Sequence, residues 1–259
     1  MAIRFGPAGL GGVKEAENNL EAFSQNGLRA CEIAFTYGVY IRDKEDAVRI
    51  GKKAKELEIK LSIHAPYWIN LNSAEKVKIK QSKERILACC QVAEWLGAER
   101  VVFHPGFYGK MDEKETYRNI RAEILELQEK IKSKKWKVKL CPETTGKVNV
   151  FGKEEEILKL VKDTKCGFTI DFSHLYARSQ GRMSYKEMYD KVKSFDELHC
   201  HFSGIEFSDK GERRHVDTPD SEIKKLLKVL PKNKDITIIN EAPNPPRDAV
   251  RMLNIWKGL

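Results

Sequence analysis

Short apolar segments alternate with longer amphipathic ones along most of this chain. The apolar segments are brief and rich in Ile, Val and Phe, a composition typical of buried parallel strands. They span residues 3–6, 30–35, 60–65, 100–105, 137–143, 167–172, 197–203 and 236–242. The segments between them show the helical spacing of apolar residues, for example over 74–97 and 113–132. The pattern predicts eight strands, each followed by helical chain.

Eight strand-plus-helix units in 259 residues predict an α/β protein with the (β/α)8 barrel fold. We expect a single domain over residues 1–259, because no Pro-, Gly- or Ser-rich linker divides the chain. A doubly wound open sheet is the alternative, and it would call for a glycine-rich phosphate turn after an early strand. The segment GPAGLGG at 6–12 does not match GxGxxG, so the barrel is favoured.

The net charge and the cysteines indicate which partners and which cell compartment to expect. Lys and Arg number 47 against 38 Asp and Glu, a net charge of +9, which suits an anionic partner or an ion-pair-rich surface. No apolar run approaches the roughly 18 residues of a membrane span, and no signal peptide is evident. The six cysteines contain no CxxC pair. We therefore predict a cytoplasmic protein with reduced thiols and no membrane partner.

Histidines and carboxylates stand where six of the predicted strands end. In a (β/α)8 barrel these ends meet at one mouth, where catalysis takes place. Any one of these residues can be explained as a hydrogen-bonded structural group or a helix cap. Three carboxylates crowded together, however, would repel one another unless cations supply opposite charge. The predicted ligands are His64, His104, Glu143, Asp171, His174, His201, His215 and Glu241.

A ligand set of imidazoles and carboxylates suits Zn²⁺, with Mn²⁺ or Fe²⁺ as alternatives. Because four protein ligands satisfy one ion, eight candidates predict two or three ions. Closely spaced metal ions are typical of phosphoester hydrolysis. The sixth histidine, His199, lies two residues before His201 and points to the same side of its strand. We interpret it as a packed residue behind the ligands.

Six short motifs, taken in order and with their spacing, resemble the endonuclease IV family of zinc-dependent apurinic/apyrimidinic endonucleases, within the xylose isomerase-like barrels. They are HAPYWINL at 64–71, HPG at 104–106, PETTG at 142–146, DFSH at 171–174, HFSG at 201–204 and NEAP at 240–243. The resemblance implies hydrolysis of the DNA backbone 5′ to abasic sites, in base excision repair, by a cluster of three zinc ions.

The resemblance also assigns the ligands to individual ions. His64 and His104 would hold one ion, with Glu143 bridging to a second. Asp171, His201 and Glu241 would complete the second ion, and His174 and His215 would belong to the third.

One position departs from the family pattern. The family has an acidic ligand two residues before the histidine matched by His215, and this chain has Arg213 there. Glu212 or Asp217 is the candidate substitute. The guanidinium of Arg213 would instead contact the substrate phosphate.

The resemblance further implies catalytic roles and a partner. Glu143 would fix a pair of ions, Glu241 would orient the attacking water, and Arg213 would stabilise charge on the phosphate. The partner would be double-stranded DNA with abasic sites, bound by a monomer. Cations and aromatics of the loops at the mouth would contact it. These are Tyr37, Tyr40, Arg42, Tyr67, Trp68, Arg178, Arg182 and Arg214. The densest basic run, at 130–139, would face the other end of the barrel as a solvated helix end.

Two other functions stay open. A sugar isomerase or epimerase of the same superfamily would hold a single ion with Glu143, Asp171, His201 and Glu241, and would leave the other histidines without a purpose. A metal-bound DNA-binding protein without turnover is the third possibility, favoured by Arg213 alone. The number of metal ions per chain and an incision assay on abasic DNA separate the three.

Overall fold

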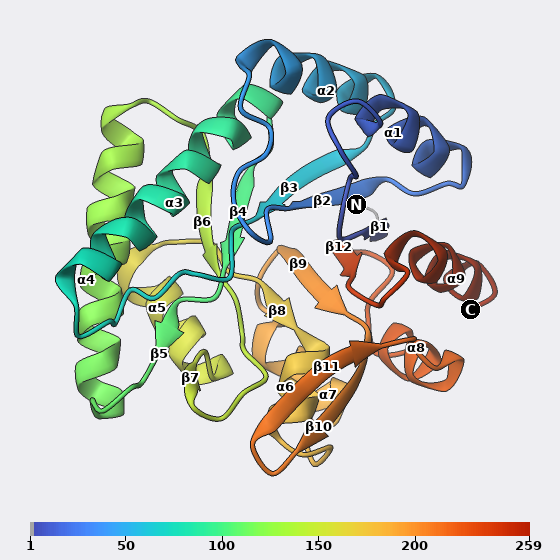
Figure 1. Cartoon of the computed structure of the whole chain (residues 1–259). Helices are drawn as coiled ribbons and strands as arrows, with labels where there is room; N and C mark the ends of the chain where they lie inside the picture. Colours follow the sequence, from blue (N-terminus) through green and yellow to red (C-terminus); the bar gives the residue numbers. More distant parts are fainter. Residues whose placement is uncertain (1–2) are drawn as a thin grey trace.

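In the computed structural model, which describes residues 3–259, eight parallel strands follow one another around a barrel in chain order (Figure 1). The barrel strands are β1 (Ile3–Pro7), β2 (Ala30–Ala34), β3 (Lys60–His64), β4 (Arg100–Phe103), β6 (Lys139–Pro142), β8 (Ile170–Asp171), β9 (Glu197–Phe202) and β12 (Asp235–Asn240). Each lies within or overlaps one of the eight apolar segments of the sequence. The predicted (β/α)8 barrel is therefore confirmed.

Two single bridges close the barrel. One sheet has the order β1-β12-β9-β8 and the other the order β2-β3-β4-β6. A parallel bridge between Ala8 and Glu32 joins β1 to β2, and one between Glu143 and Thr169 joins β6 to β8. One bridge includes Glu143, a predicted metal ligand, and the other includes Glu32. The closure of the barrel thus fixes their backbone positions.

Nine helices of the described chain surround the strands in Figure 1. They are α1 (Ala16–Gln25), α2 (Lys44–Glu56), α3 (Lys76–Leu96), α4 (Glu113–Ser133), α5 (Glu154–Thr164), α6 (Phe172–Arg178), α7 (Tyr185–Val192), α8 (Asp220–Leu227) and α9 (Pro245–Lys257). The sequence pattern predicted α3 and α4 to within two residues. Aspartates cap the N-termini of α2 and α4: Asp43 accepts the N–H of Glu45, and Asp112 that of Glu115. Of these helices, none is both long and apolar enough to cross a membrane.

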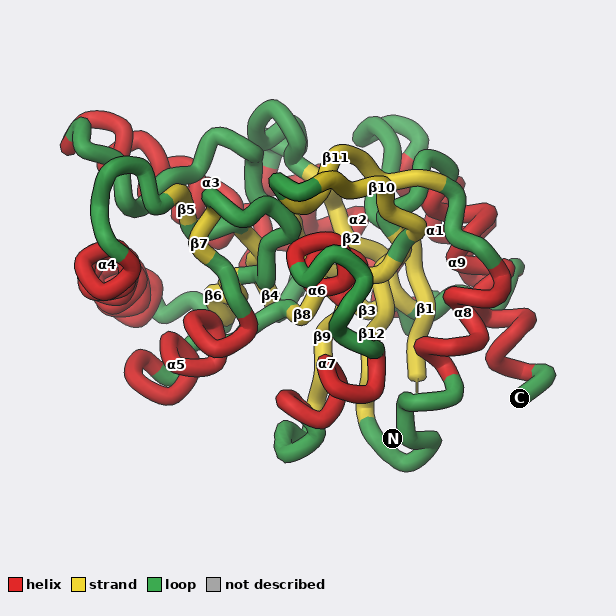
Figure 2. Tube along the Cα trace, turned by 90° about the horizontal axis from the view of Figure 1, so that it is seen from below, coloured by secondary structure: helices red, strands yellow, loops and turns green. Residues whose placement is uncertain are grey.

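The two ends of the barrel differ. Four short strands lie beyond the C-terminal ends of the barrel strands, at the upper side of Figure 2. β5 (Gly106–Phe107) pairs with β7 (Val150–Phe151), and β10 (Gly204–Ser208) forms a hairpin with β11 (Gly211–Val216). The basic run 130–139 joins the end of α4 to the start of β6, at the opposite end. This is the location that the sequence predicted for it.

A continuous apolar core lies between the strands and the helices, and it includes fully buried phenylalanines from β1, β4 and β9. All six cysteines are buried and free. Inside the barrel, by contrast, polar side chains of β2, β3 and β9 contact one another. These are Glu32, Ser62 and His199. The interior of the barrel therefore contains a network of hydrogen-bonded polar side chains.

Candidate metal centre

The eight predicted ligands converge at the mouth of the barrel, around a cavity of about 530 Å³. Barrel strands bring six of them there, because each sits at or just beyond the C-terminal end of a strand. The other two come from α6 and from β11. Together with Glu212, these residues form three groups that can each hold a cation, since in every group one ligand atom per residue lies within 4.8 Å of the others.

The first group joins the ends of β3, β4 and β6. Glu143 is fully buried, and its Oε2 lies 3.1 Å from Nε2 of both His64 and His104. Nδ1 of His64 lies 2.8 Å from the carbonyl of Ala65. As the donor in that bond, it leaves the lone pair of Nε2 directed at the carboxylate. This is the arrangement of a histidine ligand fixed by its outer nitrogen.

The second group joins β6, β8, β9 and the residue after β12. It consists of Glu143, Asp171, His201 and Glu241. Nδ1 of His201 lies 3.1 Å from Oε1 of Glu143 and 3.4 Å from Oε1 of Glu241. Asp171 also caps α6, because its Oδ1 accepts the N–H of His174 at 2.7 Å. Its other oxygen, Oδ2, makes no hydrogen bond and remains free for a cation.

The third group consists of His174, Glu212 and His215. Nδ1 of His174 lies 3.0 Å from the carbonyl of Thr144, and Nε2 lies 3.5 Å from Oε2 of Glu212. Nδ1 of His215 lies 2.6 Å from the hydroxyl of Ser203, and Nε2 lies 3.9 Å from Oε1 of Glu212. Both histidines thus have one nitrogen bonded to the protein and the other directed at the same carboxylate. Of the two candidate substitutes in the sequence, the structure places Glu212 here.

A β-bulge explains how a carboxylate three residues before a histidine reaches the same side of a strand. In β11 the residue Glu212 pairs with Phe207 of β10. The preceding residue of β10, Glu206, pairs with Arg214, which leaves Arg213 opposite no residue. Side chains alternate along a regular strand, so a spacing of three would put the carboxylate and the histidine on opposite faces. The extra residue restores them to one face.

The loop after β6 packs closely against this hairpin. The N–H of Glu212 donates to the carbonyl of Gly146 at 3.0 Å, and Lys147 forms a bridge with Gly211. A Cβ at position 146 would lie 2.6 Å from Cβ of Glu212. Glycine at this position therefore leaves the room in which the carboxylate sits.

The chemistry of the donor set fits divalent cations. Several buried side-chain atoms of the centre lack a hydrogen-bond partner in the described chain, namely Nε2 of His104, His174 and His201 and Oδ2 of Asp171. Unpartnered polar atoms are rare in protein interiors, because each costs free energy. A cation at each group would satisfy the atoms of His104, His174 and Asp171. Imidazoles and carboxylates together match the preferences of Zn²⁺, Mn²⁺ and Fe²⁺.

The electrostatics of the centre also indicate cations. Burial opposes ionisation of Glu143, yet the surrounding histidines, His201 first, hold its pKa well below the ordinary value. Burial raises the pKa of Asp171, and the negative charges of Glu143 and Glu241 add to that rise. Burial lowers the pKa of His64, but Glu143 outweighs this and raises it to about 9. The carboxylates thus draw positive charge to the centre, which metal ions can supply.

The arginines predicted to contact DNA beside the third ion lie on the hairpin and face solvent. Arg213 and Arg214 are exposed, and Arg214 forms an ion pair with Glu206 at 2.9 Å. The cationic side chain that lines the cavity is instead Lys147, among the residues described. Sequence reasoning missed Lys147. Its signal was its place four residues after Glu143, in the loop that follows β6.

The aromatic residues predicted to contact DNA fall into two classes. Tyr37, Tyr67 and Trp68 are exposed near the mouth, at 84%, 61% and 60%, and Tyr67 lines the cavity. Phe107 of β5 is also exposed and lines the cavity, although sequence reasoning left it out of the candidate list. Tyr40 is partly buried and packs edge-on against a core phenylalanine.

The remaining predicted DNA contacts donate to backbone carbonyls of this chain. The guanidinium of Arg178 donates to several carbonyls of the loop after β6, including Lys147 at 2.7 Å and Val150 at 2.9 Å. Nε of Arg182 donates to the carbonyl of Ser179 at 3.0 Å. Arg42 is exposed and donates to a carbonyl of its own loop. Arg178 therefore braces the loop that carries Gly146 and Lys147.

Comparisons with known proteins agree with the barrel fold. The model of the xylose isomerase-like TIM barrel family matches residues 20–257. An uncharacterized protein of Methanocaldococcus jannaschii is 37% identical over 276 aligned positions, which cover 100% of this chain and 98% of that protein. A probable endonuclease 4 of Mycoplasmopsis pulmonis is 26% identical over 233 positions, covering 85% of this chain and 80% of that protein.

Solved structures with the same fold include SacUVDE, an endonuclease IV and a D-tagatose 3-epimerase-like protein. SacUVDE superposes with a TM-score of 0.80 at 15% identity and covers 100% of this chain and 98% of its own. Endonuclease IV from Thermus thermophilus gives 0.74 at 20%, covering 98% of both chains. A D-tagatose 3-epimerase-like protein gives 0.72 at 22%, covering 98% of this chain and 96% of its own. At these identities the likeness concerns the fold alone.

Proposed function

The chain belongs to the xylose isomerase-like TIM barrel family, and from that premise we propose that it is a metal-dependent phosphodiesterase that cleaves double-stranded DNA 5′ to abasic sites. Probable endonuclease 4 proteins among its relatives support this choice of substrate. We propose zinc as the metal, because the ligand groups combine imidazoles with carboxylates.

The observation that carries the proposal is the presence of three ligand groups at one mouth. Glu143 belongs to two of the groups, and Glu212 completes the third. A single-ion enzyme has no use for His64, His104, His174 and His215 together. Clusters of ions are typical of phosphate-ester hydrolysis, in which both the attacking and the leaving oxygen need stabilisation.

The side chains of the centre would have distinct roles. Glu143 would join two groups, since its two oxygens face different histidines. Divalent ions held there would supply Lewis-acid chemistry, which activates water and stabilises negative charge on phosphate. Glu241 is about one-sixth exposed and lines the cavity, so its free oxygen would orient the water that attacks phosphorus. The outer nitrogens of the histidines would stay bonded to the protein and hold the rings in place.

Lys147 is the cation best placed to meet the substrate phosphate. It lines the cavity beside Glu212, whereas Arg213 lies on the exposed side of the hairpin. We expect Lys147→Ala to lower the rate of incision on abasic DNA more than Arg213→Ala does. A larger loss in the arginine variant would restore the role that the sequence assigned to Arg213.

The exposed aromatics around the mouth would contact the DNA. Tyr67 and Phe107 line the cavity, and Tyr37 and Trp68 are exposed in the loops that follow β2 and β3. Bases stack on such rings at about 1–3 kcal/mol each. We therefore expect Trp68→Ala to weaken binding of abasic duplex by roughly 5- to 100-fold. Tyr40→Phe, at a packed ring, is the matched control and should leave binding unchanged.

An incision assay tests the proposed function. Purified protein loaded with Zn²⁺ is incubated with a duplex that carries one abasic site, and the 5′ incision product is measured. The expected result is incision by the wild type and its loss in His104→Ala. Absence of incision by a wild-type protein with full metal content would refute the nuclease proposal.

A sugar epimerase is the second candidate, because Glu143, Asp171, His201 and Glu241 form a complete site for one ion by themselves. The cavity of about 530 Å³ also suits a small ligand. One ion per chain together with epimerisation of a ketose would favour this function. Three ions per chain would favour the phosphodiesterase.

A further inference from the structure

A carboxylate that is absent from the predicted ligand set lies inside the barrel, directly behind the centre. Glu32 of β2 is fully buried. Its Oε2 accepts the hydroxyl of Ser62 at 2.7 Å and lies 2.9 Å from Nε2 of His199. Its Oε1 lies 2.9 Å from Nε2 of His201. Glu32 therefore contacts one predicted metal ligand and two residues that lie deeper in the barrel.

The two nitrogens of His201 face different partners. Nδ1 faces Glu143 and Glu241 in the second ligand group, and Nε2 faces Glu32. A neutral imidazole carries its proton on one nitrogen and a lone pair on the other. If Nε2 donates to Glu32, the lone pair of Nδ1 points into the ligand group. Neither Nε2 of His201 nor Oε1 of Glu32 has a hydrogen-bond partner elsewhere in the described chain, so the carboxylate at 2.9 Å favours this tautomer, which can bind a cation through Nδ1.

We propose that Glu32 is a positioning residue, which fixes the orientation and tautomer of His201 for metal binding and raises the basicity of its Nδ1. This inference rests on the metal centre of the proposed function. Carboxylates that accept from the outer nitrogen of a ligating histidine act in this way in other metalloproteins. The other histidines with a bonded outer nitrogen use a carbonyl, as His64 and His174 do, or a hydroxyl, as His215 does. Glu32 is a carboxylate outside the three ligand groups, and it faces His201 of the second group.

The surroundings of Glu32 are built to hold the carboxylate in one place. The carbonyl of Glu32 accepts the N–H of Gly9 at 2.7 Å, and its backbone forms the bridge with Ala8 that closes the barrel. Ser62 and His199 contact the same oxygen from neighbouring strands. Three contacts to one buried carboxylate leave it little freedom to move. Its geometry is therefore available to His201 before any ion binds.

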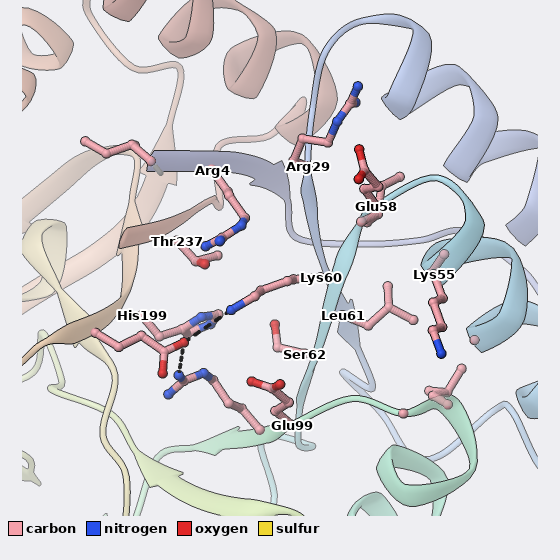
Figure 3. A pocket seen from close by; sticks show the side chains of 18 residues that line it. Arg4, Arg29, Lys55, Glu58, Lys60, Leu61, Ser62, Glu99, His199 and Thr237 are labelled. Atoms are coloured by element: carbon pink, nitrogen blue, oxygen red, sulfur yellow. Dashed lines mark ion pairs between the residues drawn. The ribbon is translucent and has the colours of Figure 1, made fainter. Parts of the chain in front are cut away.

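The far end of this network opens into a second cavity, of about 600 Å³, at the opposite end of the barrel. In Figure 3, His199 and Ser62 lie beside Lys60 on its wall. Several cations line this cavity, but the central ones are paired. Glu197 lies 2.5 Å from Arg100 and 3.5 Å from Lys60. The central cations of this cavity are therefore held in ion pairs with Glu197, and the residue of this network that contacts the centre is Glu32.

Metal affinity of Glu32 variants tests the proposal. Glu32→Gln keeps the volume and removes the charge, and Glu32→Ala removes the acceptor. Ser62→Ala is the matched control, because it loses one hydrogen bond to Glu32 and leaves the carboxylate against His201. Zn²⁺ affinity is measured by competition with a chelator, and the ligand-field spectrum is recorded on Co²⁺-loaded protein.

The expected result for Glu32→Gln is a roughly 10- to 100-fold loss of affinity for one ion and a shifted Co²⁺ spectrum. Glu32→Ala should lose more, and Ser62→Ala should match the wild type in both readouts. If Glu32→Ala does not fold, Glu32→Gln decides. Folded Glu32→Gln with wild-type affinity and spectrum would overturn the proposal. A wild-type chain that binds no divalent ion would overturn the centre as well, whereas full metal content without DNA incision would overturn the proposed function alone.

Discussion

Deletion of Arg213 tests the geometry of the third ligand group. The deletion removes the unpaired residue of the bulge and puts Glu212 two residues before His215. A strand rises about 3.3 Å per residue and alternates its faces. Without a bulge, the present spacing of three would separate the two residues by roughly 10 Å and place them on opposite faces. A spacing of two places them on one face, about 7 Å apart.

The shortened hairpin keeps its existing pairs. Glu212 can still pair with Phe207, and His215 with Ile205, as in the present register. We therefore expect the deletion variant to hold as many ions as the wild type. Glu212→Gln is the contrasting variant, and it should lose one ion per chain. A fall in occupancy from about 99% to about 10% at the same free metal requires a loss in affinity near 1000-fold, or about 4 kcal/mol.

Metal content per chain after equilibration in a buffer of fixed free Zn²⁺ is the assay. Thermal unfolding of both variants shows whether they are folded. The reasoning is refuted if the deletion variant loses the same ion as Glu212→Gln while it remains folded. In that case the bulge would not be what directs Glu212 toward the histidines.

Three further predictions concern stability. Asp248→Ala should cost about 3 kcal/mol and lower Tm by roughly 6–12 °C, because the fully buried carboxylate accepts a backbone N–H at 2.9 Å and Arg251 at 2.7 Å. Burial would raise the pKa of Glu197, but Arg100 outweighs burial and lowers that pKa below its ordinary value of 4.5. The ion pair therefore stabilises the fold fully at pH values above 4.5. This stabilisation is lost as the pH falls through the lowered pKa. Tm measured from about pH 7 to about pH 3 should fall less in Arg100→Gln than in the wild type. Gly146→Ala should lower the free energy of unfolding by about 1–3 kcal/mol and weaken metal binding at the third ligand group. The reason is that the added Cβ would lie 2.6 Å from Cβ of Glu212. Unchanged Tm and metal content would contradict this close fit.

The alternation of apolar and amphipathic segments was sufficient to predict the barrel, because a strand buried on both sides needs a continuous apolar run. It predicted strand lengths less well. The segment 167–172 contains only two residues of regular strand, Ile170 and Asp171. Lys165 adopts a left-handed conformation after α5, with φ 59°, and Asp171 already caps α6. The chain between two helix ends is too short there for a longer strand.

That the strand-end candidates lie together could be predicted, because the topology of a (β/α)8 barrel brings those ends together. Glu32 escaped this reasoning because it lies in the middle of β2, where an apolar residue is expected. The signal that could have found it is the ionisable residue itself, in a segment otherwise apolar. A carboxylate at such a position is costly unless other buried groups bond to it. Here Ser62 and His199 supply those bonds to Oε2, and Nε2 of His201 lies 2.9 Å from Oε1.

Glu212 shows why a ligand outside the strands of the barrel is harder to predict. Its sequence spacing to His215 is wrong for a regular strand, and the bulge that corrects the spacing depends on the pairing register with β10. Register arises from contacts between two strands and from the loop after β6, which packs on the hairpin through Gly146. The contacts with that loop join residues that are far apart in the sequence. The departure at Arg213 therefore changes the backbone of β11 and leaves a carboxylate in the third ligand group.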